Sequence, residues 1–511
     1  MLFPTVLHKI DGPAITSEQI VNIAPGEGKI PVTPYNEPNW EALAFVKQFS
    51  EGKFHFNSER KQKITPIKYA QTRLKCCDSR FASDPQYIFG LLNWVERETV
   101  YSTINFVERK RKCGPSKAAD VQNNSTFKSL ISDAEIFASF KKIRGTPQYF
   151  KNMMHNILAK VRQFGPPTFW ITFSAAEFKW TDIIKIVASQ FGENLDDSTI
   201  NSMDWSSKVQ YLKRNPVTVA RQIDYRFSQL WGKVILGGLH PIGQILNYDE
   251  RGEFQDRGTE HIHAPVHVEN APTIENDSRE DVISFIDKYV TCSIPDKQLH
   301  PELNKLVNSL QTHHCTKTCK KKKGIKCRFN APWPPTEQTK IVFANEDKKS
   351  LDKANNCINK ILKEIQIIGD AIENFDLDQL LDSAHVSRED YDSCLDIMYK
   401  RCTMLYKRKP NEAWVVPYNT VLLYTWCANM NIQCITGIYG VIAYLTSYLT
   451  KPERSMSELM RAASKEAASL PIKEKLTKLG KVFQNSRDLS THEAIVRTIS
   501  IPLRRSNIDV Q

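Results

Sequence analysis

Two histidines separated by one residue, His261 and His263, have a spacing that suits paired metal ligands. They lie in the stretch EFQDRGTEHIHAPVHV, residues 253–268, which predicts a β-hairpin with its turn at residues 256–259. Alternate residues of a strand share a face, so both imidazoles would point to one side while Ile262 turns into the core. The pattern therefore predicts a two-histidine claw for a divalent cation.

The opposite strand of this hairpin offers oxygen atoms for the same cation. Glu253 and Gln255 share one face, and either could supply a third ligand while leaving room for phosphate oxygens and water. The alternative is that the histidines are satisfied by the protein or exposed without a metal. His267, on the same strand, is interpreted in that way.

A pair of tyrosines forms the second group. Tyr444 and Tyr448, in IYGVIAYLTSYLTKPE, would share one face of a helix that ends before Pro452. A phenol can attack phosphorus when a metal polarises the phosphate and neutralises the developing charge. Packing of both rings in a core is the alternative interpretation.

The third group is the cysteine and histidine cluster in THHCTKTCKKKKGIKCRFNAPWPP. Thiolates and a neutral imidazole suit tetrahedral zinc, which would order a loop too polar to fold by burial. The expected ligands are His313, Cys315, Cys319 and Cys327. His314 competes with His313, and reduced cysteines in a basic loop are the alternative.

Basic residues near the three groups are expected to contact a phosphate backbone. They are Lys320, Lys321, Lys322, Lys323, Arg257 and Lys451.

These groups need strands and helices to position them. β-branched and aromatic residues predict strands at 168–173, 243–255 and 261–268. Helical spacing predicts helices within 66–112 and at 278–289, 302–312, 351–374 and 376–402, whereas residues 1–65 lack periodicity. The expected fold is α+β: a central antiparallel sheet carrying the histidines, flanking helices, a zinc-stabilised insertion, and a helical and irregular N-terminal region.

Composition favours a polyanionic partner. Lys and Arg exceed Asp and Glu by 69 − 57 = 12 in 511 residues. No signal peptide or membrane span is evident, so we expect a soluble intracellular protein without a membrane partner. The run at residues 109–112 is interpreted either as a nuclear address or as a solvated basic turn. Nucleotide-phosphate loops, GxSxG elbows and HExxH motifs are absent from the sequence.

The order of these groups resembles the replication-initiator nuclease region of Helitron transposases, which belong to the His-hydrophobe-His endonucleases of rolling-circle replication. The resemblance covers nearly the whole chain. The matching stretches are PPTFWITFSAAEFKW, EFQDRGTEHIH, the HHCTKTCKKKKGIKCRFNAPWPP block, EAWVVPYN, NMNIQ and AYLTSYLTK, with IAPGEGKIP and YAQTRLKCCDSRFASDPQYIFG upstream.

The resemblance implies an activity and its residues. His261 and His263 would bind Mg²⁺ or Mn²⁺, with Gln255 as the first choice for third ligand and Glu253 as the second. Tyr444 and Tyr448 would each attack a phosphodiester of single-stranded DNA at transposon ends and targets, leaving a 5′-phosphotyrosine link and a free 3′-hydroxyl. Trp170, Phe178 and Trp180 are candidates for base stacking, although core packing is the favoured role for each.

The sequence departs from the family at two points. Glu260 stands where proline often precedes the first histidine, and the ATP-driven helicase part is not found in these residues. A separate helicase domain or protein is therefore an expected partner, and this chain is expected to have no helicase or ATPase activity.

The expected divisions are an N-terminal basic region at 1–128, nuclease segments at 129–300 and 341–511, and the zinc insertion at 301–340. A catalytically dead, transposon-derived DNA-binding protein is the main rival, and a structural or interaction protein is the second.

Overall fold

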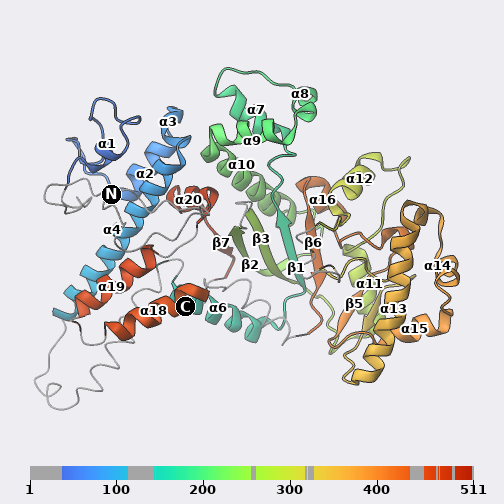
Figure 1. Ribbon diagram of the computed structural model, residues 1–511. Helices are drawn as coiled ribbons and strands as arrows, with labels where there is room; N and C mark the ends of the chain where they lie inside the picture. Colours follow the sequence, from blue (N-terminus) through green and yellow to red (C-terminus); the bar gives the residue numbers. More distant parts are fainter. Residues whose placement is uncertain are drawn as a thin grey trace, which may run out of the picture.

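A five-stranded antiparallel sheet forms the centre of the protein, in the order β6-β1-β3-β2-β7 (Figure 1). Its strands are β1 (Phe169–Ser174), β2 (Ile245–Phe254), β3 (Glu260–Val268), β6 (Met430–Cys434) and β7 (Arg504–Ser506). The computed structural model describes residues 37–112, 143, 146–254, 260–316, 319, 327, 329–437, 454–467, 470, 472–485 and 489–508. The predicted α+β class and antiparallel sheet are confirmed.

One face of the sheet, here called the core face, carries the main hydrophobic core. Every second residue of β1 and of β3 is buried on this face. These residues are Phe169, Ile171 and Phe173 of β1 and Ile262, Ala264 and Val266 of β3. This face packs against α7 (Thr181–Ser189), α10 (Pro216–Gln229), the π-helix Leu230–Ile235 and α16 (Thr420–Trp426). Trp180 belongs to this core, which confirms core packing for it, and Phe178 packs against the core's edge.

The opposite face carries the histidines and is called the histidine face. Helix α6 (Pro147–Phe164) covers part of it, with Met153, Ile157 and Val161 packing on the buried Trp170 ring. Lys160 of α6 is 2% exposed and its Nζ lies 3.1 Å from Asp249 Oδ2 of β2. A buried ammonium needs such a partner, so this pair fixes α6 over β2.

The N-terminal helices form a second core beside the sheet. These helices are α1 (Trp40–Ala44), α2 (Pro66–Leu74), α3 (Ser79–Ala82) and α4 (Pro85–Lys112). They pack with α20 (Thr491–Thr498), while α18 (Arg454–Glu466) and α19 (Ile472–Asn485) form a further cluster with the end of α4. Buried Glu41 accepts hydrogen bonds from the Tyr69 and Tyr87 hydroxyls, which ties α1 to α2 and α4.

Short helices connect the strands of the central sheet and lead toward the His313 cluster. They are α8 (Asp197–Ser202), α9 (Trp205–Arg214), α11 (Arg279–Tyr289), α12 (Pro301–Leu306) and the π-helix Val307–Gln311. The predicted helix at 278–289 is confirmed, with Ser278 accepting a hydrogen bond from the Asp281 amide at its N-terminus. No helix among the described residues combines the length and apolar character needed to cross a bilayer.

A separate helical lobe lies at the other end of the sheet (Figure 1). It comprises α13 (Lys348–Ile368), the 3₁₀ turn Gly369–Asn374, α14 (Leu377–Ser383), α15 (Arg388–Ile397) and the two-stranded sheet of β4 (Lys340–Val342) and β5 (Thr403–Leu405). The prediction of one helix over 376–402 was wrong. His385 has φ of 52° and Ser387 caps α15, so the chain turns between two helices.

Candidate metal centres

His261 and His263 stand together on the histidine face of β3. Ile262 between them is 5% exposed and belongs to the main core, as the alternation of a strand requires. The two imidazole centroids are 6.4 Å apart with 29° between the ring planes. His267 differs, because its Nδ1 lies 3.1 Å from Asn247 Nδ2 and its Nε2 lies 3.1 Å from the Gly165 carbonyl. Its interpretation as a satisfied structural histidine agrees with these bonds.

Strand β1 places two hydroxyls against the claw. Thr172 pairs with His263 and Ser174 with His261 in the antiparallel register. Thr172 Oγ1 is 3.1 Å from His263 Nδ1, and Ser174 Oγ is 3.3 Å from His261 Nδ1. The Trp170 ring, next in the same row, lies 5.6 Å from the His263 ring. One signal in the sequence could have identified these hydroxyls, since Thr172 and Ser174 alternate with the buried residues of β1.

Strand β2 brings a carboxylate to the same place. Glu253 pairs with His261 and Arg251 with His263, and Glu253 Oε2 lies 3.2 Å from His263 Nε2. Two ligands on an octahedral cation, each at about 2.1 Å and at right angles, are about 3 Å apart. The spacing between His263 and Glu253 is that of a hydrogen bond between an imidazole and a carboxylate, and it would also suit two adjacent ligands of one divalent cation. Gln255 and Arg257 lie outside the described residues.

The paired tyrosines also lie outside the described residues. Tyr444, Tyr448 and Lys451 fall in residues 438–453, directly after the described segment that ends with Gly437. Strand β6 precedes this stretch, and only β1 separates β6 from β3 in the sheet. The lysines Lys320, Lys321, Lys322 and Lys323 are outside the described residues as well.

The cysteine and histidine cluster is assembled around one imidazole nitrogen. His313 Nε2 lies 3.2 Å from Cys327 Sγ, 3.5 Å from Cys315 Sγ and 3.8 Å from Cys319 Sγ. Tetrahedral zinc with bonds of about 2.1 Å to nitrogen and 2.3 Å to sulfur would separate these atoms by about 3.6 Å. Among the described residues, His313, Cys319 and Cys327 form the group of three ligands that could hold a metal ion such as zinc.

The surroundings of this cluster explain why His313 and not His314 faces the thiols. The His313 amide donates to the Trp414 carbonyl at 2.8 Å, and its ring lies 6.4 Å from Trp414 and 5.4 Å from Phe329. The neighbouring His314 side chain is exposed. Cys319 and Cys327 are each 5% exposed, whereas Cys315 is exposed at the edge of the group.

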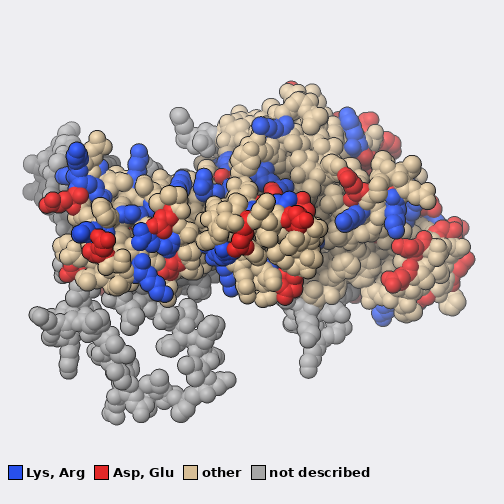
Figure 2. Space-filling view, turned by 90° about the horizontal axis from the view of Figure 1, so that it is seen from above, with Lys and Arg blue, Asp and Glu red and all other residues tan. Residues whose placement is uncertain are grey.

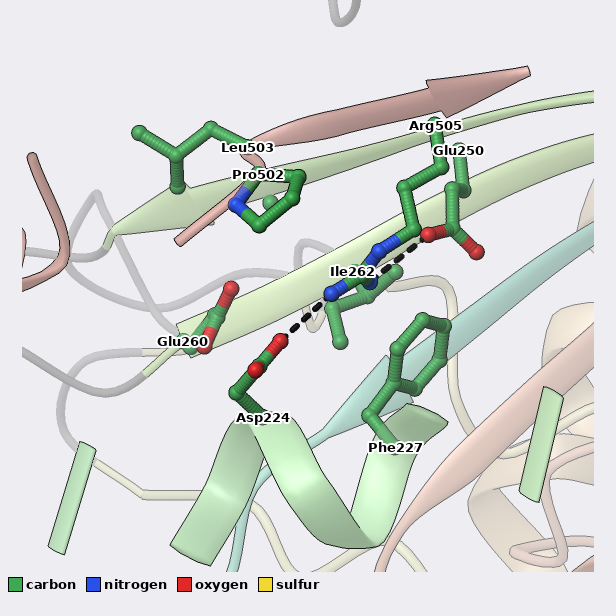
Figure 3. A pocket seen from close by; sticks show the side chains of 9 residues that line it. Asp224, Phe227, Glu250, Glu260, Ile262, Pro502, Leu503 and Arg505 are labelled. Atoms are coloured by element: carbon green, nitrogen blue, oxygen red, sulfur yellow. Dashed lines mark hydrogen bonds and ion pairs between the residues drawn. The ribbon is translucent and has the colours of Figure 1, made fainter. Parts of the chain in front are cut away.

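An ion-pair network lies behind the claw, on the core face. Arg505 of β7 reaches Glu250 of β2, 2.8 Å from its Oε1, and Asp224 of α10 at 2.5 Å (Figure 3). Glu250 is 2% exposed, and burial raises its pKa to about 7 although Arg505 opposes the shift. No local pattern in the sequence predicts this network, because its members come from three distant segments.

Glu260, at the start of the histidine strand, lies beside the same network. Its carboxylate packs against Gly252, where a Cβ atom would come within 2.5 Å of Glu260 Oε1. On the other side, Glu260 Oε2 is 3.9 Å from His492 Nε2 of α20. Burial lowers the pKa of His492 to about 4. Glu260 therefore places a carboxylate on the core side of the histidine strand, close to the His492 imidazole.

Charge is divided unevenly between the two ends of the protein (Figure 2). Residues 37–112 carry 14 Lys and Arg against 9 Asp and Glu, a balance of +5, and the described residues of 454–508 carry 10 − 4 = +6. Residues 348–397, which form the α13–α15 lobe, carry 6 − 11 = −5. A polyanion would therefore be attracted to the N- and C-terminal helices and repelled by the lobe.

Comparison with known families identifies one domain. Residues 69–265 match the family described as the Helitron helicase-like domain at the N-terminus. The match runs from α2 through β3 and includes His261 and His263. Residues 69–265 therefore form a Helitron helicase-like domain. Comparison with curated proteins found no match.

Proposed function

We propose that the protein is a metal-dependent single-stranded DNA endonuclease and strand transferase of Helitron-type rolling-circle transposition. The observation that supports this most is the two-histidine face with Glu253 Oε2 3.2 Å from His263 Nε2, inside a segment that matches the Helitron family. The basic helices beside the sheet supply a surface for the DNA. The substrates are single strands at transposon ends and targets, the helicase activity comes from another domain or protein, and the compartment is the nucleus.

The chemistry follows from the residues of the claw and the paired tyrosines. A divalent cation held by His261, His263 and an oxygen ligand would neutralise charge on the phosphate. The Tyr444 or Tyr448 oxygen forms a bond to phosphorus, the bond from phosphorus to the 3′-oxygen breaks, and the 3′-oxygen takes up a proton. The phosphotyrosine ester retains the bond energy, so attack by a 3′-hydroxyl rejoins strands without ATP.

Zinc at the His313 cluster has a structural role in this proposal. The sulfur atoms of Cys315, Cys319 and Cys327 all lie within 3.8 Å of His313 Nε2, and a site with four protein ligands leaves no open position for substrate. We expect one tightly held zinc per chain that is not exchanged during DNA cleavage.

Covalent capture tests the proposal. The full chain is incubated with 5′- or 3′-labelled single-stranded DNA and Mn²⁺ and separated on a denaturing gel, next to Tyr444→Phe, Tyr448→Phe and the double variant. Tyr225→Phe, an exposed tyrosine of α10, is the matched control. We expect a metal-dependent adduct carrying the strand 3′ of the cut, which the double variant loses and the control keeps. Folded protein that binds DNA and forms no adduct would favour the DNA-binding relic.

A further inference from the structure

The two hydroxyls of β1 are matched to the two histidines in number, spacing and register. Thr172 and Ser174 alternate along β1 as His263 and His261 do along β3, and each hydroxyl reaches the Nδ1 atom of its own partner. We propose that Thr172 and Ser174 are positioning residues that hold the two imidazole rings in place and accept the Nδ1–H hydrogen bond of the tautomer able to bind metal. This inference rests on the proposed function.

The ring nitrogen that carries the proton decides whether a histidine can bind metal through Nε2. A neutral imidazole has one N–H group and one lone pair, and metal binding at Nε2 requires the proton at Nδ1. A hydroxyl oxygen opposite Nδ1 accepts that proton in a hydrogen bond. Such an outer partner fixes the ring orientation and strengthens the ligand, and its loss typically weakens metal affinity about 10- to 100-fold.

A hydroxyl also suits the metal-free state better than a carbonyl or carboxylate would. Glu253 Oε2 lies 3.2 Å from His263 Nε2 and can accept a hydrogen bond from an Nε2–H group. In that state the His263 Nδ1 has a lone pair, and the Thr172 hydroxyl can rotate to donate to it. The same side chain therefore serves both tautomers, and metal binding requires only a hydroxyl rotation and a proton shift.

His267 provides an internal contrast on the same strand. Its Nε2 faces the Gly165 carbonyl at 3.1 Å, so this nitrogen is held as a donor and its Nδ1 faces the side-chain amide of Asn247. Burial lowers the pKa of His267, which keeps the ring neutral. His261 and His263 therefore have Nδ1 opposite a hydroxyl, whereas His267 has Nε2 opposite a carbonyl.

The test measures Mn²⁺ affinity of the zinc-loaded full chain by titration calorimetry. The variants are Thr172→Val, which keeps the branched shape without the hydroxyl, Ser174→Ala and the double variant, with Thr172→Ser as the conservative control. We expect affinity to fall about 10- to 100-fold for each loss of a hydroxyl and to stay within about threefold for Thr172→Ser. Adduct formation by Thr172→Val should recover at higher Mn²⁺, which loss of fold would not allow.

Two further variants separate this inference from the function beneath it. His261→Ala should abolish the Mn²⁺ binding that the wild type shows. If it does, while the double hydroxyl variant binds Mn²⁺ as the wild type does, the positioning role is overturned and the nuclease proposal stands. If His261→Ala binds Mn²⁺ with wild-type affinity, the metal claw itself is refuted. A Thr172→Val chain that fails to fold leaves Ser174→Ala to decide.

Discussion

Replacing Glu250 with glutamine should change how stability depends on pH. Glu250 is 2% exposed between β2, Arg505 and α10, and its pKa in the folded protein is raised from 4.5 to about 7. The unfolded chain therefore releases this proton at lower pH than the folded protein does. Between pH 4.5 and pH 7 the wild type loses stability as pH rises, because only the unfolded state ionises freely.

The size of the effect follows from the shift. A difference of about 2.5 between the two pKa values, at about 1.4 kcal/mol for each pKa unit, amounts to a free energy between about 3 and 4 kcal/mol. Glutamine has the same shape and does not titrate, so the unfolding free energy of Glu250→Gln minus that of the wild type should rise by about 3 kcal/mol over this range. Above pH 7 the difference should level off.

Urea unfolding followed by tryptophan fluorescence at pH 4.5, 5.5, 6.5 and 7.5 measures this difference. Glu193→Gln is the control, because hydrogen bonds from Tyr211 and Arg214 lower the pKa of Glu193. The unfolding free energy of Glu193→Gln minus that of the wild type should change only below pH 4.5. There it should fall as pH rises, which is the opposite of the change expected for Glu250→Gln. A Glu250→Gln difference that stays flat from pH 4.5 to 7, or falls, would refute the claim that desolvation outweighs the Arg505 ion pair.

Three further predictions use other parts of the structure. The pKa of His492 is lowered from 6.5 to about 4, so the wild type should lose stability relative to His492→Gln as pH falls through that range, measured in the same urea series. Cys327→Ser should lose the bound zinc, assayed by mass spectrometry, and lower the thermal midpoint, while the exposed Cys76→Ser should change neither. Replacing Lys61, Lys63 and Lys68 with glutamine should reduce the salt dependence of single-stranded DNA binding by about 2 in the log–log slope, at about 0.7 per contact, and the same change at Lys348, Lys349 and Lys353 of the acidic lobe should not.

The strands that carry the claw could be predicted because each has a strong local signal. Residues 168–173 are bounded by Pro166 and Pro167, and the structure places β1 at Phe169–Ser174. The alternation around Ile262 also gave the correct face for His261 and His263. Local sequence decides the pleat of a strand, so its two faces can be separated without knowing its neighbours.

The partners of those strands could not be predicted, because register between distant segments leaves no local trace. Thr172 and His263 are 91 residues apart, and their pairing emerges only in the assembled sheet. The edge strand β7 is three residues long and polar, Arg504–Ser506, without the alternation that marks a strand. It joins the sheet because Arg504 and Arg505 both find buried carboxylates on β2. Such a strand is specified by ion pairs and not by periodicity.

A buried glutamine connects the His313 cluster to the edge of the sheet that carries the claw. Gln311, two residues before His313, is fully buried; its side chain donates to the Met430 carbonyl at 2.8 Å and accepts from the Met430 amide at 3.0 Å. Met430 begins β6, which pairs with β1, the strand that supplies both hydroxyls to the histidines. A metal that orders the His313 loop would therefore also stabilise β6 at the edge of the sheet. Through β6 it would stabilise β1, which positions the two histidines.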